Sequence, residues 1–567
     1  MKLCSSIFRF ILYTFIFLGA SNSSYSRTTD FNYNAKNISN YFSAVVSFHD
    51  MDYTNSQKFF KKINNFDDEN ADYFSKLIES LVNLEKYNEA QIYSKRLERK
   101  NISTFESNLI LGLYEFKKSN YNKAKFYFNK LDSNFRDISI NDLLKPSLIN
   151  WSEILEAKNK DGVESLGKIS TNFNNFRSIQ RIFADCHFED PVTENQFRKM
   201  LKNKKSNLSR YHFFFANYLA NQNKMDYAKE TINLASKTYP NNLLIRQFQK
   251  VLSENENNRN LFNCKNPNHI LAEILYIVGN FLSSSGDYRL SNFYINLSKY
   301  LNPDFSSYDS LLAENFSILG NYDKSKNIYK KLSKSGSVYK WYSSKKIAII
   351  LERQGARDEA VIFLSRIYKN IRKDIYKTFD LANFLREEGG YEKSIELYST
   401  ILLKIENDHE IYPEVLHRRG TAYERSNNWE LAEKDLLRSL EIEPDSPYVM
   451  NYLAYTWIEK GKNVQKALRM LRRANDLKKN DGYITDSLGW ALYKLNNFSE
   501  AKKYLRLAII FMPRDPIIND HFGDCLWMNN RKIQARYYWE YALSLDSTEK
   551  ELKEKIKKKL LFGLEES

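Results

Sequence analysis

The sequence predicts an all-α protein folded as a solenoid of about twelve stacked helical hairpins. Its 567 residues exceed the roughly 250 to 300 at which a single core stops growing, so several domains or a repeat array is expected. Only 10 prolines and 17 glycines occur, which favours long helices with short connections over a β-sandwich or barrel. A period near 34 residues recurs along most of the chain, and such a period is typical of stacked hairpins.

Residues 1–26 are predicted to be an export signal. Lys2 and Arg9 flank an apolar stretch, Phe10 to Ala20, that is shorter than the ~20 residues of a membrane helix but typical of a secretory signal. The alternative is an uncleaved signal anchor. No cysteine directly follows Leu18-Gly19-Ala20, so no lipid-attachment site is expected. The mature protein is therefore expected to be soluble or peripherally attached to a membrane, with no later spanning segment.

The repeat is weaker in the first two thirds of the chain. The slots that small residues usually occupy in the repeat hold Ala44, Ile78, Ala90, Gly112, Ala124, Ala216, Ala228, Ala235, Gly279, Ala313, Ala348, Ala360 and Ala382 there. The predicted parts are N-terminal repeats at 27–140, degenerate helical repeats at 141–210, one repeat at 211–250, an irregular segment at 251–269 and central repeats at 270–408. The segment 251–269 contains many asparagines and Pro267. The chain is either one array or two arrays joined there by a hinge.

The clearest copies lie at 409–548. One small-residue slot recurs at Gly420, Ala454, Gly489 and Gly523. Small, large and small residues follow it at fixed offsets: Ala432, Leu436 and Ser439; Ala467, Leu471 and Ala474; Ala501, Leu505 and Ala508; Ala535, Trp539 and Ala542. Small residues let two antiparallel helices approach closely, while the large ones fill the gap between successive helices. Residues 549–567 are predicted to be a polar-faced capping helix and tail.

This pattern resembles the tetratricopeptide repeat (TPR), and Leu488-Gly489 with Ala501, Leu505, Ala508 and Pro513 carries the resemblance. The resemblance implies a right-handed superhelix whose concave groove is lined by the first helix of each hairpin. It also implies which offsets from the small slot face that groove. These offsets select Asn451, Tyr452, Tyr455, Ile458 and Glu459; Asp486, Ser487, Trp490, Tyr493 and Lys494; and Asp520, His521, Asp524, Trp527 and Met528. Such residues suit capture of an extended peptide or partner helix, and the alternative for each aromatic is packing between helices.

No motif predicts catalysis, a cofactor or a metal site. His409 begins a run like the zinc-protease helix motif, but Pro413 stands where the second histidine is needed. Asp520, His521 and Asp524 could place metal ligands on one helix face, although acids around a histidine on a repeat helix are usually solvated surface. Cys186-His187 lacks an orienting third group. We therefore expect a protein that is not an enzyme, has no cofactor and takes no small-molecule substrate.

Charge and cysteine content limit which partners and which compartment are expected. The 85 basic and 69 acidic residues give a net charge of +16, which suits an acidic partner, but bases and acids are interspersed, so nucleic acid is not the expected partner. Beyond the signal, Cys186, Cys264 and Cys525 are too widely spaced for a zinc ribbon. Three buried free thiols are expected, with a Cys186–Cys264 bridge as the alternative in an oxidising compartment.

The C-terminal segments Asn451 to Tyr455, Asp486 to Trp490 and His521 to Asp524, with Trp539, are similar to a subfamily of exported TPR proteins of Gram-negative bacteria. One member type is an outer-membrane lipoprotein that acts as adaptor for a carboxy-terminal processing protease and presents cell-wall hydrolases to it. The resemblance implies a non-catalytic scaffold of the periplasm or cell envelope that binds other proteins or extended peptides. The alternatives are an assembly factor for outer-membrane or secretion machinery, and a repeat-fused enzyme, for which the irregular stretch 145–210 is too short.

Overall fold

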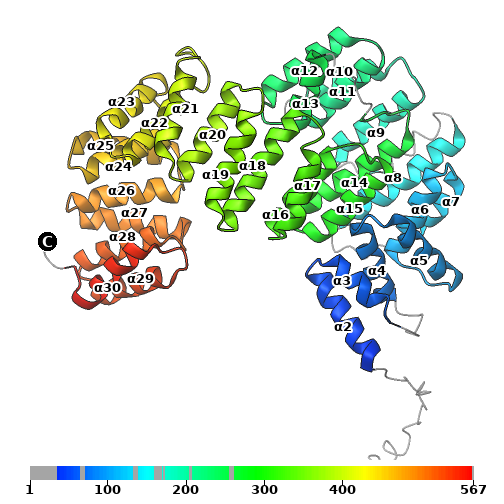
Figure 1. Cartoon of the computed structure of the whole chain (residues 1–567), viewed down its shortest axis with the longest axis horizontal. Helices are drawn as coiled ribbons and strands as arrows, with labels where there is room; N and C mark the ends of the chain where they lie inside the picture. The colour runs from blue at the N-terminus through cyan, green and yellow to red at the C-terminus, as the bar shows by residue number, and fades with distance from the viewer. Residues whose placement is uncertain are drawn as a thin grey trace, which may run out of the picture. The chain divides into compact units, whose positions relative to one another are not determined.

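The computed structural model describes residues 35–63, 71–131, 138–158, 166, 169, 173–203, 207–254 and 261–564, so the predicted signal at 1–26 lies outside the described residues. The described residues form 29 helices, α2 to α30, and no strand, which confirms the all-α prediction (Figure 1). The chain divides into two compact units, Met1–Ser343 and Ser344–Ser567. Within the described residues, no helix combines the length and the apolar character that a membrane crossing requires.

The helices of the first unit are α2 (Ala35–His49), α3 (Tyr53–Phe60), α4 (Ala71–Asn83), α5 (Tyr87–Arg99), α6 (Phe105–Lys117), α7 (Tyr121–Asn129), α8 (Ile138–Ala157), α9 (Asn174–His187), α10 (Thr193–Leu201), α11 (Ser209–Asn221), α12 (Met225–Thr238), α13 (Leu243–Ser253), α14 (Pro267–Ser284), α15 (Tyr288–Leu301), α16 (Ser307–Ile318) and α17 (Tyr322–Leu332). Helix α18 (Ser337–Arg353) crosses the boundary. The second unit continues with α19 (Arg357–Lys369), α20 (Ile375–Glu387), α21 (Tyr391–Leu402), α22 (Tyr412–Arg425), α23 (Trp429–Ile442), α24 (Pro447–Glu459), α25 (Val464–Leu477), α26 (Gly482–Lys494), α27 (Phe498–Phe511), α28 (Pro516–Met528), α29 (Lys532–Ser544) and α30 (Lys550–Phe562).

The small and large slots of the repeat lie where the hairpin prediction requires them. In the second unit, each first helix packs on the second helix of its hairpin, as α26 does on α27 and α28 on α29. Gly420, Ala454, Gly489 and Gly523 are buried, and so are the residues at the following offsets. A Cβ at Gly489 would lie 2.7 Å from Leu505 Cγ, so the small slot is what allows the two helices to approach. The fold is therefore the predicted hairpin solenoid.

The turn inside each hairpin of the second unit depends on a left-handed residue. The positive-φ residues at these turns are Gly355, Gly389, Asn427, Gly461, Asn496 and Asn530. Glycine has no Cβ to clash in this conformation, and asparagine tolerates it better than most residues. The chain can therefore end one helix and begin its antiparallel partner within three or four residues.

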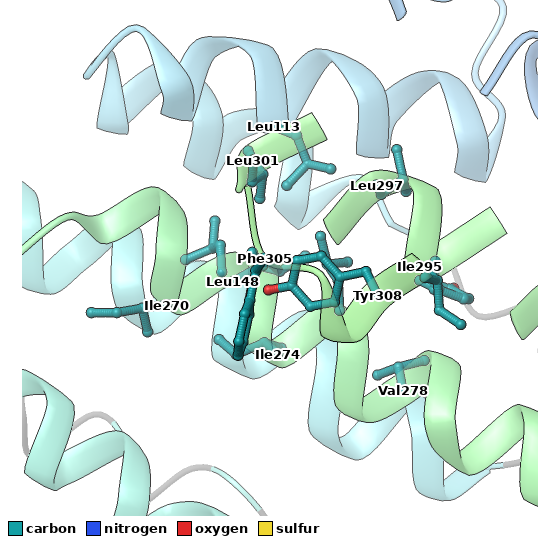
Figure 2. Close-up of a cluster of buried hydrophobic side chains, with 14 of the residues drawn as sticks. Leu113, Leu148, Ile270, Ile274, Val278, Ile295, Leu297, Leu301, Phe305 and Tyr308 are labelled. Carbon is teal, nitrogen blue, oxygen red and sulfur yellow. The ribbon is translucent and has the colours of Figure 1, made fainter. Parts of the chain in front are cut away.

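The first unit brings distant hairpins together into one core. Figure 2 shows buried side chains from α6, α8, α14 and α15, and from the segment that leads into α16, directed toward one another. Leu113 of α6 and Leu148 of α8 lie in the same cluster as Ile274 of α14 and Leu297 of α15 (Figure 2). Helix α15 also contacts α4, and α14 contacts α8. The hairpins of this unit therefore pack on neighbours far along the chain as well as on adjacent ones.

The segment 251–269, which is predicted to be an irregular hinge, is described only in part. The division into units falls between Ser343 and Ser344, whereas Phe262 is buried in the core of the first unit with its ring 4.3 Å from that of Phe214. Residues 255–260 of the segment lie outside the described residues.

The prediction of three free thiols is wrong for two of them. Cys186 of α9 and Cys264 form a disulfide, with 5.9 Å between their Cα atoms. Cys525 is a buried free thiol, as expected, and burial raises its pKa to about 12. The bridge ties the segment that precedes α14 to α9.

Candidate partner-binding face

Three first helices of the second unit, α24, α26 and α28, carry the predicted partner-binding residues. Their starts are fixed by local signals: Pro447 at the first turn of α24, the side chain of Asp481 accepting two backbone N–H groups of α26, and Asp515 doing the same for α28. The starts recur after 35 and 34 residues, and α26 contacts both α24 and α28. Equivalent offsets on the three helices therefore repeat along one face.

Trp490 is the centre of an aromatic stack on this face. Its ring is nearly parallel to the imidazole of His521, with 3.9 Å between centroids, and to the ring of Tyr493, with 4.7 Å. Its indole Nε1 donates a 2.7 Å hydrogen bond to Glu459, and the ammonium of Lys494 lies 5.2 Å from its ring centroid. Because Trp490 is only 9% exposed, most of its surface joins α24, α26 and α28 together.

The buried charge of the site centres on His521. Its Nδ1 lies 2.9 Å from Asp486 Oδ2. Burial lowers the pKa of His521, but attraction to Asp486, their hydrogen bond and the charges of Asp520 and Asp524 outweigh it and raise this pKa above its usual 6.5. The imidazole is therefore held in its charged form to higher pH than a free histidine.

The capping helix α30 supplies a lysine to α28, which is the first helix of the last hairpin. Lys559 Nζ lies 2.8 Å from carboxylate oxygens of both Asp520 and Asp524, and Asp524 also accepts a 2.9 Å hydrogen bond from Trp539 Nε1. Burial, followed by repulsion from Asp520, raises the pKa of Asp524 to about 6, against the lowering effect of Lys559. The sequence predicted the cap but not this pairing, although the lysine run in α30 was the available signal.

The side-chain oxygens at one repeat offset are fully hydrogen-bonded in only one of the three hairpins. Asn451, Asp486 and Asp520 occupy the position three residues before the small slot. Both oxygens of Asp520 bind Lys559, whereas Asn451 Oδ1 and Asp486 Oδ1 are buried and have no hydrogen-bond partner within the described residues. An unpaired buried acceptor costs roughly 1 to 3 kcal/mol. The oxygens on α24 and α26 are enclosed by the protein, so a partner on the surface does not reach them.

The predicted residues divide into a buried and an accessible set. Asp486, Ser487, Trp490, Asp520, His521 and Asp524 are buried between helices. The accessible set, which we call the aromatic face, is half-buried or exposed and consists of Asn451, Tyr452, Tyr455, Glu459, Tyr493, Lys494, Trp527 and Met528. Ile458 is buried and lies outside this set. Glu424, which the offsets did not select, accepts a 2.7 Å hydrogen bond from the Tyr452 hydroxyl.

The side chains considered for metal binding are turned to other partners. His521 binds Asp486, and Asp520 and Asp524 bind Lys559. In the part of the chain that the structure describes, no group of three or more His, Cys, Asp or Glu side chains is placed to hold a metal ion. Cys186 is bonded to Cys264.

The fold and this face define a helical-repeat protein of the hairpin-solenoid class. Residues 487–509 match the model of the tetratricopeptide repeat family. A TPR repeat-containing protein of Pseudomonas aeruginosa is 32% identical over 116 residues, which are 20% of this chain and 20% of the relative. The chain thus matches only about a fifth of that relative's length. Residues 487–509 therefore carry a tetratricopeptide repeat, and the chain is similar to tetratricopeptide repeat proteins.

Solved structures with similar hairpins have low sequence identity to the chain. A thermophilic TPR protein of Thermus thermophilus is 16% identical, with a TM-score of 0.30, and the match covers 33% of this chain and 100% of that one. A tetratricopeptide repeat protein of Parabacteroides merdae is 17% identical, with a TM-score of 0.33, and the match covers 50% of this chain and 97% of that one. Tetratricopeptide repeats form a non-catalytic scaffold fold that generally mediates contacts between proteins.

Proposed function

We propose that the chain is a non-catalytic scaffold of the bacterial cell envelope that binds a partner protein in extended or helical form along the aromatic face. The observation that carries the proposal is the aromatic face itself, where Tyr455 and Tyr493 stay half-buried beside the exposed charges of Glu459 and Lys494. A partner in extended or helical form would lay apolar side chains against these rings and pair its own polar groups with the two charges.

The composition of the aromatic face suits a peptide partner. Tyr455 and Tyr493 are half-buried, so they offer apolar area that is rigid before binding. Glu459 and Lys494 are exposed and lie 3.8 Å apart, and they supply one charge of each sign beside the aromatic rings. Aromatic contact area with hydrogen-bonding groups around it is the usual composition of a binding hot spot.

The proposed compartment is the periplasm, and the Cys186–Cys264 bridge supports it. Disulfides persist in oxidising compartments such as the bacterial periplasm and are rare in the cytosol. The apolar stretch Phe10 to Ala20 after Lys2 and Arg9 is consistent with export. Within this proposal, the partner would be a processing protease or a cell-wall hydrolase, as in the similar exported subfamily.

Crosslinking in intact cells, followed by purification of the tagged chain and mass spectrometry, tests the proposal. The variant Tyr455→Ala with Lys494→Ala changes the aromatic face without touching a fully buried side chain. Tyr537→Ala with Lys503→Ala is the matched control, since both residues are exposed on the second helices α29 and α27.

Recovery of a protease or hydrolase that is lost in the first variant and kept in the control would support the scaffold and the face. Recovery of outer-membrane or secretion components alone would replace the adaptor role by an assembly role. Partners confined to the cytoplasm would overturn the proposed compartment.

A further inference from the structure

The far end of the second unit carries exposed apolar side chains from three helices. Leu561 and Phe562 at the end of α30 are 72% and 66% exposed, Ile533 at the start of α29 is 87% exposed, and Met528 at the end of α28 is 42% exposed. Two contacts place these ends together: Arg536 of α29 donates to the carbonyl of Leu560, and Gly563 lies against the ring of Trp527. We call Met528, Ile533, Leu561 and Phe562 the apolar tip.

Gly563 is the residue that lets the chain end α30 at this point. Its φ is +77°, which residues other than glycine rarely adopt, and a Cβ there would collide with the ring of Trp527. The backbone can therefore approach Trp527 closely. Leu561 and Phe562 consequently project into solvent immediately before a fixed anchor, rather than from a frayed helix end.

Basic residues predominate around the tip. The two stretches that form it, 525–539 and 555–564, contain no acidic residue, and Asp524, Glu540 and Glu554 flank them. Their basic residues are Arg531, Lys532, Arg536, Lys555, Lys557, Lys558 and Lys559. Lys555, Lys557 and Lys559 have carboxylate partners on α28 or α30, so Arg531, Lys532 and Lys558 supply the exposed charge that no ion pair among the described residues offsets. Glu565 and Glu566 follow in the sequence and lie outside the described residues.

We propose that the apolar tip and its basic rim dock on the surface of an anionic lipid bilayer. Large exposed apolar side chains beside lysine and arginine are typical of helices that lie in the membrane interface, where the apolar groups enter the acyl boundary and the bases meet anionic headgroups. A nucleic-acid surface would use the bases but would leave Leu561, Phe562 and Ile533 exposed to water. The scaffold would thereby be held at a membrane through its second unit.

Co-sedimentation of the purified full chain with vesicles tests this docking. Vesicles in which about a third of the lipid is an anionic phospholipid are expected to retain the chain. Purely zwitterionic vesicles should retain much less of it, and raising the salt concentration should weaken binding. Leu561→Ser with Phe562→Ser is expected to lower the partition coefficient by about tenfold or more. Arg531→Gln with Lys558→Gln is expected to lower it by roughly 25-fold at low salt, about fivefold for each base removed.

The matched control is Leu403→Ser with Lys404→Gln at the end of α21, where one apolar side chain, 88% exposed, stands beside a base. This control should bind like the unaltered chain, and circular dichroism should show unchanged helicity in every variant. Equal binding by all variants, or no preference for anionic vesicles, would overturn the proposal. Binding to nucleic acid that depends on Arg531 and Lys558 but not on Leu561 and Phe562 would overturn it as well.

Discussion

The guanidinium of Arg289 pairs with the buried carboxylate of Glu79, although the two residues are 210 positions apart. Arg289 belongs to α15 and Glu79 to α4, so the contact joins hairpins that no nearest-neighbour stacking would bring together. Burial raises the pKa of Glu79 to about 7, and the attraction of Arg289 opposes that rise. Asn83 with Asn296 and Glu85 with Lys299 form a polar row beside this pair.

Arg289→Met is expected to destabilise the contact between α4 and α15 by roughly 2 to 4 kcal/mol. Breaking a fully buried ion pair typically costs about 3 to 5 kcal/mol, and the cost is smaller here because the Arg289 side chain is 32% exposed. The second substitution Glu79→Leu should recover most of the loss, since it removes the unpaired buried carboxylate. Hydrogen–deuterium exchange of peptides from α4 and α15 measures the change locally.

Lys61→Ala is the control for the Arg289 variant. Lys61 pairs with Glu89, but the side chains are 33% and 40% exposed, so its loss should cost less than about 1 kcal/mol. A result in which Arg289→Met exchanges no faster than Lys61→Ala would mean that the α4–α15 contact does not depend on this pair.

How much of the structure the sequence predicts depends on the range of the interaction. Ala501, Leu505 and Ala508 could be placed correctly because small and large residues at fixed offsets determine how adjacent helices pack, and all three are fully buried. The pairing of Lys559 with Asp520 could not be predicted, because it depends on the rotation of α30 about its axis. The Glu79–Arg289 pair could not be predicted either, since a 34-residue period carries no information on contacts 210 residues apart.

Gly489→Ala is expected to destabilise the second unit by about 1 to 3 kcal/mol, because overpacking forces neighbouring groups to shift. The new Cβ would lie 2.7 Å from Leu505 Cγ and 3.1 Å from the backbone nitrogen of Leu505. Gly420→Ala is the control at the same slot, where the nearest atom is 3.1 Å away, and it should cost less. Thermal denaturation followed by circular dichroism compares the two, and an equal loss would argue against slot-specific packing.

Removal of the Cys186–Cys264 bridge should destabilise the first unit by about 4.5 kcal/mol, on the chain-entropy estimate for a loop of this length. The variant for this test is Cys186→Ser with Cys264→Ser, and urea denaturation measures the loss. Cys525→Ser is the control, because that thiol is free. Mass spectrometry of unreduced digests should show residues 186 and 264 in one linked pair of peptides, and alkylation of both thiols without reductant would contradict the bridge.

The titration of His521, whose ring stacks on Trp490, should make the second unit less stable as the pH rises above neutrality. The pKa of His521 is raised in the folded state, so its stabilising contribution is complete below the unfolded value near 6.5 and is lost as the pH rises through the folded value. The pKa of Asp524 is raised to about 6, so its contribution is lost earlier, between about pH 4 and pH 6. Both groups therefore weaken the unit in the same direction.

His521→Gln separates the two contributions, because glutamine keeps hydrogen-bonding groups near Asp486 but does not titrate. Hydrogen exchange of α26 and α28 between about pH 4 and pH 9, corrected for intrinsic rates, should show protection that falls with pH in the unaltered chain and falls less above neutral pH in the variant. Asp524→Asn should remove the fall between about pH 4 and pH 6 and leave the upper part in place. If protection in His521→Gln falls as steeply above neutral pH as in the unaltered chain, another group controls the dependence and the Asp486–His521 contact carries no charge in that range.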